Sequence, residues 1–320
     1  MSAYLATESA HVPVMVSEAM KYLAPKDGEI YIDGTFGAGG YSRAILQSAD
    51  CQVFAIDRDP DVEIFAEKLG QEFPSRFNLI LGNFADMAEL LVGRGVEKVD
   101  GVVLDLGVSS MQLSHAGRGF SFSHDGPLDM RMERQGQTAE WLINSAEEKE
   151  LADIIYNYGG ERMSRKIARA IVNARGEKPI STTLELAEII RRAVRRYNDK
   201  IDPATRAFQA IRIWVNDELE AVAKGLASAE KLLAPGGRLV VISFHSLEDS
   251  IVKNFLNEKA GKAETYSRYM PLPEKKSLAV FSILTRKAVK PSSLETAENP
   301  KSRSAKLRAA IKIKPKEAIC

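Results

Sequence analysis

The stretch DGTFGAGG (residues 33–40) follows a short apolar run at 30–32 and precedes a helix-like run. This order predicts a strand, a glycine turn and a helix. Eighteen residues after Gly39, a second apolar run at 53–56 ends in Asp57. Glycines let a backbone approach a ligand closely, and a carboxylate after the next strand can hold both hydroxyls of a ribose. The stretch therefore predicts a nucleoside site in an α/β sheet.

The spacing of the glycines indicates which nucleoside this turn would hold. The dinucleotide fingerprint G-x-G-x-x-G fits poorly, because its third glycine position, counted from Gly37, is Ser42. An acid followed at four and six positions by glycine, as in Asp33, Gly37 and Gly39, is typical of S-adenosylmethionine sites. There the carboxylate lies near the cationic end of the cofactor, whereas a dinucleotide site leaves the helix N-terminus free for pyrophosphate. The alternative is a tight turn that binds nothing, and Asp57 at the expected distance favours the nucleoside site.

Alternating apolar runs and helix-like stretches predict the fold around this turn. Helix-like stretches such as 61–72 and 86–93 separate four predicted strands, at 30–32, 53–56, 77–81 and 99–104. This rhythm predicts an α/β fold in which a mostly parallel sheet carries helices on both faces, with right-handed crossovers.

Later runs are expected to complete the sheet. A long helix at 213–233, ended by Pro-Gly-Gly, precedes a fifth strand at 238–244. Two further strands, 278–286 and 305–314, are expected to form an antiparallel pair at the sheet edge. A polar loop at 287–299 would separate them.

The β-α rhythm breaks after Asp105. Residues 107–137 are rich in Gly, Ser, His and Met and indicate a long, ordered loop, and helical patterns then follow at 139–145, 147–158, 163–174 and 183–194. We therefore expect a discontinuous sheet domain, residues 1–137 and 207–320, interrupted by an inserted helical domain, residues 138–206.

Composition excludes several classes of protein. The chain has 320 residues, of which 45% are hydrophobic, and no apolar run is long enough to span a bilayer. The first ten residues lack the pattern of a secretory signal, so the cytoplasm is the expected compartment and no membrane partner is expected. Cys51 and Cys320 are the two cysteines, which gives neither a disulfide framework nor a zinc spacing. His11, His115 and His124 are too scattered in sequence to form a metal site, so we expect no metal.

Charge is distributed unevenly along the chain. Residues 160–214 contain 13 basic and 6 acidic residues, a net charge of +7, and residues 286–316 contain 10 and 2, a net charge of +8, although the whole chain has +1. Each segment alone is equally consistent with a solvated helix face. Two such segments on an otherwise acidic chain favour a nucleic-acid partner.

Ligands of open α/β sheets bind beyond the carboxyl ends of the strands, where this chain places several polar residues. Phe84 is suited to stack on an adenine, unless it is ordinary core, and Asn83 could reach the base edge. Asp105 lies where cofactor and acceptor should meet; the alternative role is to cap the following turn. After the fifth strand, His245 is either a catalytic base or, as we expect, a structural histidine, and Glu248 suits the first turn of a helix.

Ten ordered segments, which together extend over nearly the whole chain, carry a family resemblance. They are HVPVM (11–15), DGTFGAGGYS (33–42), AIDRDP (55–60), DLGVSS (105–110), RGFSF (118–122), DGPLDMRM (125–132), ATRAFQAIRIWVNDEL (204–219), LAPGGRL (233–239), ISFHSLED (242–249) and NPKSRSAKLR (299–308). With these segments the chain resembles the MraW/RsmH family of S-adenosylmethionine-dependent 16S ribosomal RNA cytosine-N4 methyltransferases.

The resemblance implies a class I methyltransferase fold with a helical domain inserted after the fourth strand. It assigns cofactor contacts to Gly39, Gly40, Tyr41, Asp57, Phe84, Asp105 and Gln112. The family usually has histidine where this chain has Tyr41, so a backbone contact there would survive but an imidazole contact would not. DLGVSS replaces the Asp/Asn-Pro-Pro-aromatic motif of many amino-methylating enzymes, so the contacts to the acceptor cannot be copied from them.

The implied reaction is in-line methyl transfer to the exocyclic amine of a cytidine in 16S rRNA or the small ribosomal subunit. The amine needs hydrogen-bond acceptors and loses a proton; Asp105, Ser109, Ser110 or a loop carbonyl could serve. We expect the basic segments to bind RNA phosphate, with Arg191, Arg192, Arg195 and Arg196 as the test cluster. The oligomeric state is open, with a homodimer as one option.

Two other functions are weighed against this one. A nicotinamide-dependent dehydrogenase would need a glycine near position 42 and a pair of hydride-handling residues, and neither is evident. An RNA-binding assembly factor that retains an inert nucleoside pocket is the alternative without catalysis.

Overall fold

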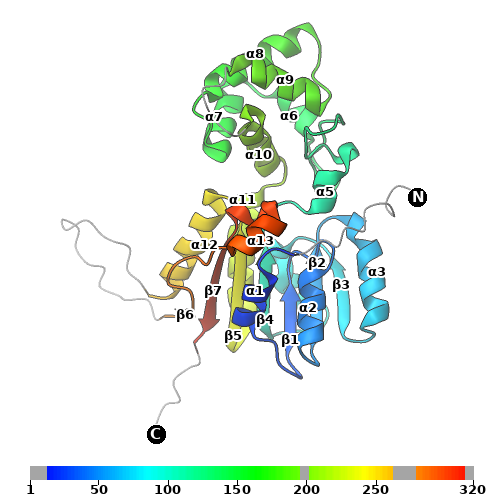
Figure 1. Cartoon of the computed structure of the whole chain (residues 1–320), viewed down its shortest axis with the longest axis vertical. Helices are drawn as coiled ribbons and strands as arrows, with labels where there is room; N and C mark the ends of the chain where they lie inside the picture. Colours follow the sequence, from blue (N-terminus) through cyan, green and yellow to red (C-terminus); the bar gives the residue numbers. More distant parts are fainter. Residues whose placement is uncertain (1–12, 195–201, 262–278, 314–320) are drawn as a thin grey trace, which may run out of the picture. The chain divides into compact units, whose positions relative to one another are not determined.

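The computed structural model describes residues 13–194, 202–261 and 279–313. The chain divides into two compact units (Figure 1), and the divisions fall between Gly107 and Val108 and between Glu218 and Leu219. The predicted inserted domain, 138–206, lies within the second unit, which begins soon after the fourth strand and extends further at both ends.

A seven-stranded sheet organises the first unit. Its strand order is β3-β2-β1-β4-β5-β7-β6, with the first five parallel and β7 antiparallel to both β5 and β6. The predicted parallel sheet and its antiparallel edge pair are confirmed. The strands are β1 Ile30–Asp33, β2 Gln52–Asp57, β3 Phe77–Leu81, β4 Val99–Asp105, β5 Leu233–Ser243, β6 Phe281–Ile283 and β7 Lys306–Lys312.

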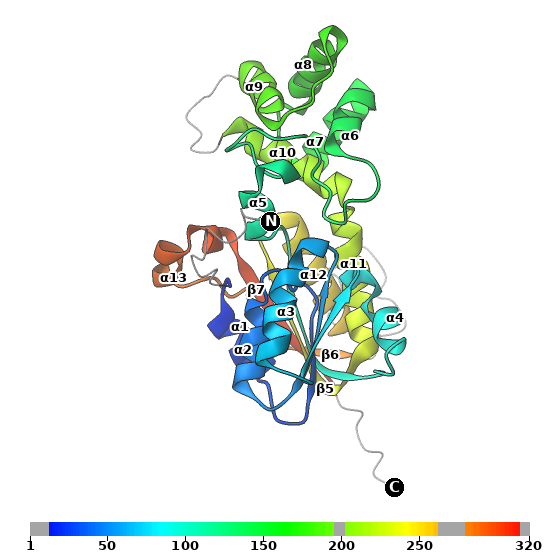
Figure 2. The same cartoon turned by 90° about the vertical axis from the view of Figure 1, so that its right-hand side faces the viewer.

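Helices cover both faces of this sheet (Figure 2). One hydrophobic core joins alternate strand residues, such as Ile32, Ile56 and Leu104, to α4, α11 and α12, while α1, α2 and α3 cover the other face. The helical elements are α1 Val16–Leu23, α2 Gly40–Ser48, η1 Pro60–Val62, α3 Glu63–Glu72, η2 Phe84–Asp86, α4 Met87–Val92, α11 Glu218–Leu232, α12 Ser246–Lys259, α13 Ser293–Glu298 and η4 Pro300–Ser304.

The second unit is helical and has its own core. Buried residues such as Leu142, Ile155, Ile167, Ile190 and Ile211 pack together within it. Its elements are α5 Ser110–Ser114, η3 Ala116–Arg118, α6 Ala139–Ser145, α7 Glu148–Gly159, α8 Ser164–Glu177, α9 Thr183–Ala193 and α10 Pro203–Val215. Four of the predicted helices are therefore present within a few residues of their expected bounds.

The single helix expected at 213–233 is wrong, because α10 ends at Val215 and α11 begins at Glu218. Asn216 explains the break: its side-chain oxygen accepts a hydrogen bond from Met132 N (2.8 Å) and its amide donates to Met130 O (2.7 Å). Asp217 then adopts a left-handed conformation with φ 46°. The buried amide thus ties the chain to a distant loop, which helical periodicity does not reveal.

Several short elements were not predicted from the sequence. The expected loop at 107–137 contains α5 and η3, and the expected loop at 287–299 contains α13. Helix α1 also had no sequence prediction. Over the described ranges, none of the helices combines the length and the apolar character that crossing a membrane requires.

Candidate active site

The glycine turn between β1 and α2 is held by the buried carboxylate of Asp33. Its Oδ2 accepts hydrogen bonds from Ser42 N (3.0 Å) and Ser42 Oγ (2.7 Å), and its Oδ1 accepts one from Thr35 N (3.3 Å). Asp33 has no accessible surface, and burial raises its pKa to about 6. In this structure, therefore, Asp33 shapes the turn, and its predicted contact with the cofactor stays a prediction.

The glycines of this turn are required by its geometry. Gly37 and Gly39 adopt positive φ angles of 54° and 82°, which side chains disfavour. A Cβ on Gly39 would lie 2.9 Å from the Phe36 ring, and one on Gly40 would lie 2.8 Å from Pro13. The turn can therefore pack closely and still present backbone to a ligand.

Asp57, at the end of β2, faces the same turn. Its Oδ2 accepts a hydrogen bond from Gly37 N (2.8 Å), and its Oδ1 accepts one from Asp59 N (2.9 Å). The residue is partly exposed, and desolvation of its carboxylate raises its pKa to about 6. Each carboxylate oxygen can accept a second bond, so the pair of ribose hydroxyls still fits here.

Phe84 follows β3 and begins η2. The ring packs against α11 so closely that a Cβ on Gly225 would lie 2.4 Å from it, yet the residue is only partly buried. Asn83 caps η2, with its Oδ1 accepting a hydrogen bond from Ala85 N (3.0 Å). One side of Phe84 thus belongs to the core while the rest of the ring can take part in stacking.

Asp105 ends β4 beside the glycine turn, and its backbone N donates a hydrogen bond to Thr35 Oγ1 (2.7 Å). Its Oδ1 is buried and has no hydrogen-bond partner among the described residues. Burial, followed by the nearby Asp33 and Glu248 carboxylates, raises the pKa of Asp105 well above its usual range. A buried acceptor without a partner is costly, so this atom marks a position suited to a ligand or substrate.

Tyr41 is buried in the first turn of α2. Its hydroxyl donates a hydrogen bond to Val14 O, in the segment that precedes α1. The side chain is thereby engaged within the protein, so the contact predicted for this position requires the backbone.

Ser109, Ser110 and Gln112 lie at the start of the second unit. Ser109 and Gln112 form a capping box on α5: Ser109 Oγ accepts a hydrogen bond from Gln112 N, and Gln112 Oε1 accepts one from Ser109 N. The local role of this pair is therefore to begin a helix. Their predicted contacts with acceptor and cofactor stay predictions.

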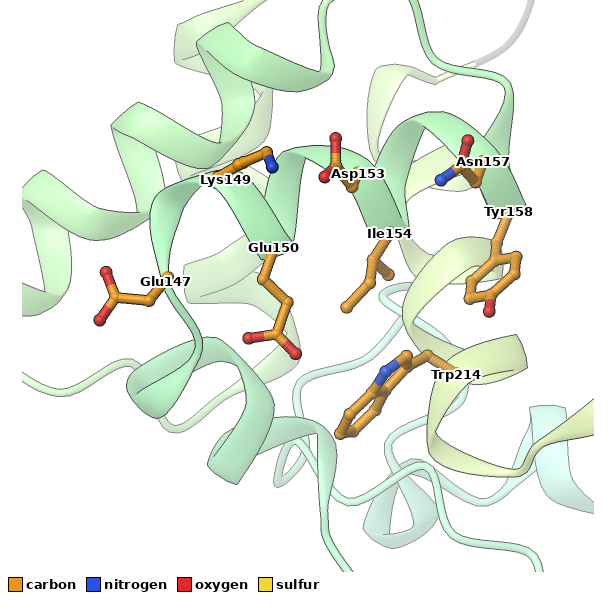
Figure 3. A pocket seen from close by; sticks show the side chains of 8 residues that line it. All are labelled: Glu147, Lys149, Glu150, Asp153, Ile154, Asn157, Tyr158 and Trp214. Carbon is orange, nitrogen blue, oxygen red and sulfur yellow. The ribbon is translucent and has the colours of Figure 1, made fainter.

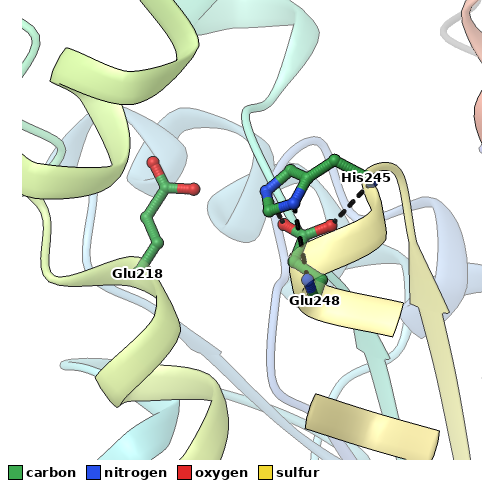
Figure 4. Close-up of side chains that lie close together, drawn as sticks. All are labelled: Glu218, His245 and Glu248. Atoms are coloured by element: carbon green, nitrogen blue, oxygen red, sulfur yellow. Dashed lines mark hydrogen bonds and ion pairs between the residues drawn. The ribbon is translucent and has the colours of Figure 1, made fainter. Parts of the chain in front are cut away.

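His245 caps α12 directly after β5 (Figure 4). Its Nδ1 accepts a hydrogen bond from Glu248 N (3.4 Å), and Glu248 Oε2 accepts bonds from the backbone N of Phe244 (2.8 Å) and His245 (3.2 Å). His245 thus begins α12 as its N-cap, and the choice between a structural and a catalytic histidine stays a prediction. Its Nε2, however, is buried without a hydrogen-bond partner among the described residues.

The sequence did not indicate a cavity of about 430 Å³ in the helical unit (Figure 3). It contains none of the predicted site residues; its lining consists of α7 side chains, the preceding Glu147, and Trp214 of α10. Trp214 stacks on Trp141 with ring centroids 6.3 Å apart. The two tryptophans of the chain are thus paired there, and their spacing in sequence gives no hint of it.

Carboxylates dominate the electrostatics at the strand ends. Asp33, Asp57 and Asp105 come from three adjacent parallel strands, and burial raises the pKa of each. A cationic ligand would offset this unfavourable concentration of charge, and S-adenosylmethionine combines a sulfonium and an ammonium with a ribose. The unpartnered Asp105 oxygen and the close glycine turn therefore fit this cofactor.

The fold and this site define a class I methyltransferase with S-adenosylmethionine as its cofactor. Comparison with known proteins identifies the family. A family model described as the MraW methylase family matches residues 8–313, and the chain belongs to this family.

Curated relatives are similar to this chain over most of its length. The chain is 54% identical over 303 residues to a protein of Rhodospirillum rubrum named "Ribosomal RNA small subunit methyltransferase H", covering 93% of each chain. A protein of the same name from Maricaulis maris is 55% identical over 303 residues, covering 94% of this chain and 91% of the relative.

Proposed function

We propose that this protein transfers a methyl group from S-adenosylmethionine to the N4 amine of a cytidine in 16S ribosomal RNA, in the cytoplasm. The observation that carries the proposal is the buried, unpartnered Oδ1 of Asp105, which ends β4 beside the glycine turn. The names of the relatives support the small-subunit RNA as substrate, and the family resemblance supports the cytidine amine.

The chemistry assigns a role to each strand end. S-adenosylmethionine supplies a methyl group activated by its sulfonium. Asp57 would accept hydrogen bonds from the ribose hydroxyls, Phe84 would stack on the adenine, and Gly39 and Gly40 would bring backbone close to the ligand. Tyr41 contributes its backbone, as the family assignment requires, and Gln112 is a further candidate contact.

Asp105 has the central role towards the base that receives the methyl group. The lone pair of an exocyclic amine is delocalised into its ring, so the amine is a poor nucleophile until an acceptor orients its N–H groups. Asp105 Oδ1 provides that acceptor as the N4–carbon bond forms, the sulfur–carbon bond breaks and N4 loses a proton. Alignment of the two reactants supplies much of the rate. Asp105 is the first candidate to take up the proton, and Ser109 and Ser110 are the others.

The helical unit carries a surface suited to RNA phosphate. Arg162, which lies just before α8, and Arg165 and Lys166, in its first turn, are exposed and have no ion pair among the described residues. The helix dipole adds positive potential at this end. By contrast, Arg191 pairs with Asp202 and Arg192 with Glu188, each at 3.0 Å.

This distribution changes the test cluster expected from the sequence. Arg191 and Arg192 already have acidic partners, and Arg195 and Arg196 lie outside the described residues. We therefore assign the phosphate contacts first to the start of α8. The cytidine itself must leave its stack to reach Asp105, which is least costly from single-stranded or distorted RNA.

A direct experiment tests the reaction. The purified protein is incubated with labelled S-adenosylmethionine and small subunits from a strain that lacks this modification. Label in 16S RNA, mapped by mass spectrometry to the N4 of one cytidine, supports the proposal. Tight RNA binding without methyl transfer would instead indicate the assembly-factor function.

A further inference from the structure

Two buried side-chain atoms lack a hydrogen-bond partner among the described residues: Asp105 Oδ1 and His245 Nε2. Both lie at the carboxyl ends of adjacent parallel strands. Asp105, the last residue of β4, pairs in register with Ile242 of β5, and Leu106 N donates a hydrogen bond to Ile242 O (2.9 Å). His245 comes three residues after Ile242. Buried polar atoms are nearly always satisfied, so two exceptions at neighbouring strand ends require a common explanation.

The loops after β4 and β5 lie close together. A Cβ built on Gly107 would lie 3.7 Å from the ring of Phe244, the residue before His245. The Glu248 carboxylate, which caps this loop, also contributes to the raised pKa of Asp105. The acceptor on β4 and the imidazole after β5 therefore belong to one local cluster within the first unit.

Hydrogen bonding fixes the tautomer of His245. Because Nδ1 accepts a hydrogen bond from Glu248 N, it carries no proton, and the proton of the neutral ring is on Nε2. Glu248 Oε1 lies 3.1 Å from Nε2, but the pair lacks hydrogen-bond geometry. His245 therefore presents a donor, and a neutral Nε2–H cannot act as the proton acceptor of the reaction.

We propose that His245 determines specificity for cytosine by donating from Nε2 to the ring nitrogen N3, while Asp105 accepts from the N4 amine. This proposal rests on the proposed function and adds a residue to it. Cytosine presents a donor at N4 and an acceptor at N3, whereas uracil presents an acceptor at O4 and a donor at N3. The pair of protein groups matches cytosine and opposes uracil at both positions.

Burial makes the match selective. The side chains of His245 and Glu248 are 11% and 1% exposed, so water cannot readily replace a missing partner. A base that leaves buried donors and acceptors unpaired is rejected strongly.

The test combines a protein variant with a substrate variant. In His245→Ser, the hydroxyl can still cap α12, since serine is a favoured N-cap residue, but the Nε2 donor is removed. The substrate variant is a reconstituted small subunit whose mapped target carries 3-deazacytidine, which keeps the amine and lacks the N3 acceptor. The matched control is His124→Ser, at an exposed histidine of the helical unit.

We expect His245→Ser to lower kcat/KM on the cytidine substrate by roughly ten- to hundredfold, the effect of one buried polar group left unpaired. On 3-deazacytidine, the wild-type enzyme should already have a lowered kcat/KM, because the base lacks the N3 acceptor. His245→Ser should lower kcat/KM on this substrate little further. Cofactor affinity, measured by calorimetry, and activity of the control should stay unchanged.

Equal losses by the variant on both substrates would overturn the inference, because they would show no coupling between His245 and N3. If the variant does not fold, the wild-type enzyme still decides: 3-deazacytidine methylated as well as cytidine contradicts the contact. Absence of any methylation by the wild-type enzyme would instead refute the proposed function itself.

Discussion

Asp57 is the residue whose charge should govern cofactor affinity. Asp57→Ala removes the carboxylate that we propose for the ribose, so we expect S-adenosylmethionine to bind roughly ten- to hundredfold more weakly. Calorimetry with the wild type and with Glu67→Ala, an exposed acid on α3, provides the comparison. Unchanged affinity in Asp57→Ala would remove this residue from the ribose role.

The pH dependence of cofactor binding follows from the same carboxylate. Burial raises the Asp57 pKa to about 6, so the ionised acceptor is present above pH 6 and is progressively lost below it. We expect affinity in the wild type to fall as the pH decreases from 7 to 5. The fall should be smaller in Asp57→Ala, and equal slopes in calorimetric titrations of the two proteins would contradict this assignment.

Asp105 should control methyl transfer rather than cofactor binding. Asp105→Asn keeps the shape but removes the charge, and we expect a loss of activity on the order of 10²- to 10⁴-fold, as for other positioned acceptors. Because the Asp105 pKa lies well above its usual range, activity of the wild type should decrease towards acid pH. Methyl incorporation at several pH values measures both effects. Full activity of Asp105→Asn would require another acceptor.

Sequence identified the carboxylates at the strand ends but not the contacts of each one. The spacing of Asp33 and the glycines resembles that of a binding motif, yet the Asp33 carboxylate is buried under Ser42 and Thr35. The tautomer of His245 was also out of reach, because it depends on a backbone N–H three residues away. Residue type and spacing predict which groups meet, whereas burial decides which of their atoms are satisfied.

Among the helices and strands, those that are determined by local sequence were predicted correctly, whereas features that depend on contacts distant in sequence were not. Parallel strands that are buried on both faces give continuous apolar runs, so β1 to β4 were found from sequence. The break between α10 and α11 was not, because the side chain of Asn216 bonds to Met130 and Met132, far away in sequence. Helix α13 was missed because it is short and has no buried residue, and so has no apolar periodicity.

The start of α8 should determine how RNA affinity depends on salt. Replacing Arg162, Arg165 and Lys166 by glutamine removes three charges, and we expect the slope of log affinity against log salt to decrease in magnitude by roughly 2 for single-stranded RNA. Filter binding at several salt concentrations measures the slope. Lys149→Gln, at an exposed lysine of α7 in the same unit, is the control. A slope equal to that of the wild type would place the phosphate contacts elsewhere.

For the whole molecule, the buried carboxylates link stability to pH in the absence of cofactor. Asp33 and Asp57 have pKa values of about 6, raised by burial from an unfolded value near 3.8. The folded state therefore binds protons more tightly than the unfolded state. Their contribution to stability is fully present below pH ~4 and is lost as the pH rises through 6, by up to about 3 kcal/mol for each group.

Asp57→Asn isolates one of these contributions, because it keeps the hydrogen-bond acceptor at Oδ1 and cannot ionise. We expect the free energy of unfolding of the variant, relative to the wild type, to increase between pH 4 and pH 7 by up to about 3 kcal/mol. Urea unfolding at each pH measures this difference. S-adenosylmethionine should reduce it, since a bound cation favours the ionised carboxylate of the wild type. A difference that is constant across this pH range would show that folding leaves the pKa of Asp57 unchanged.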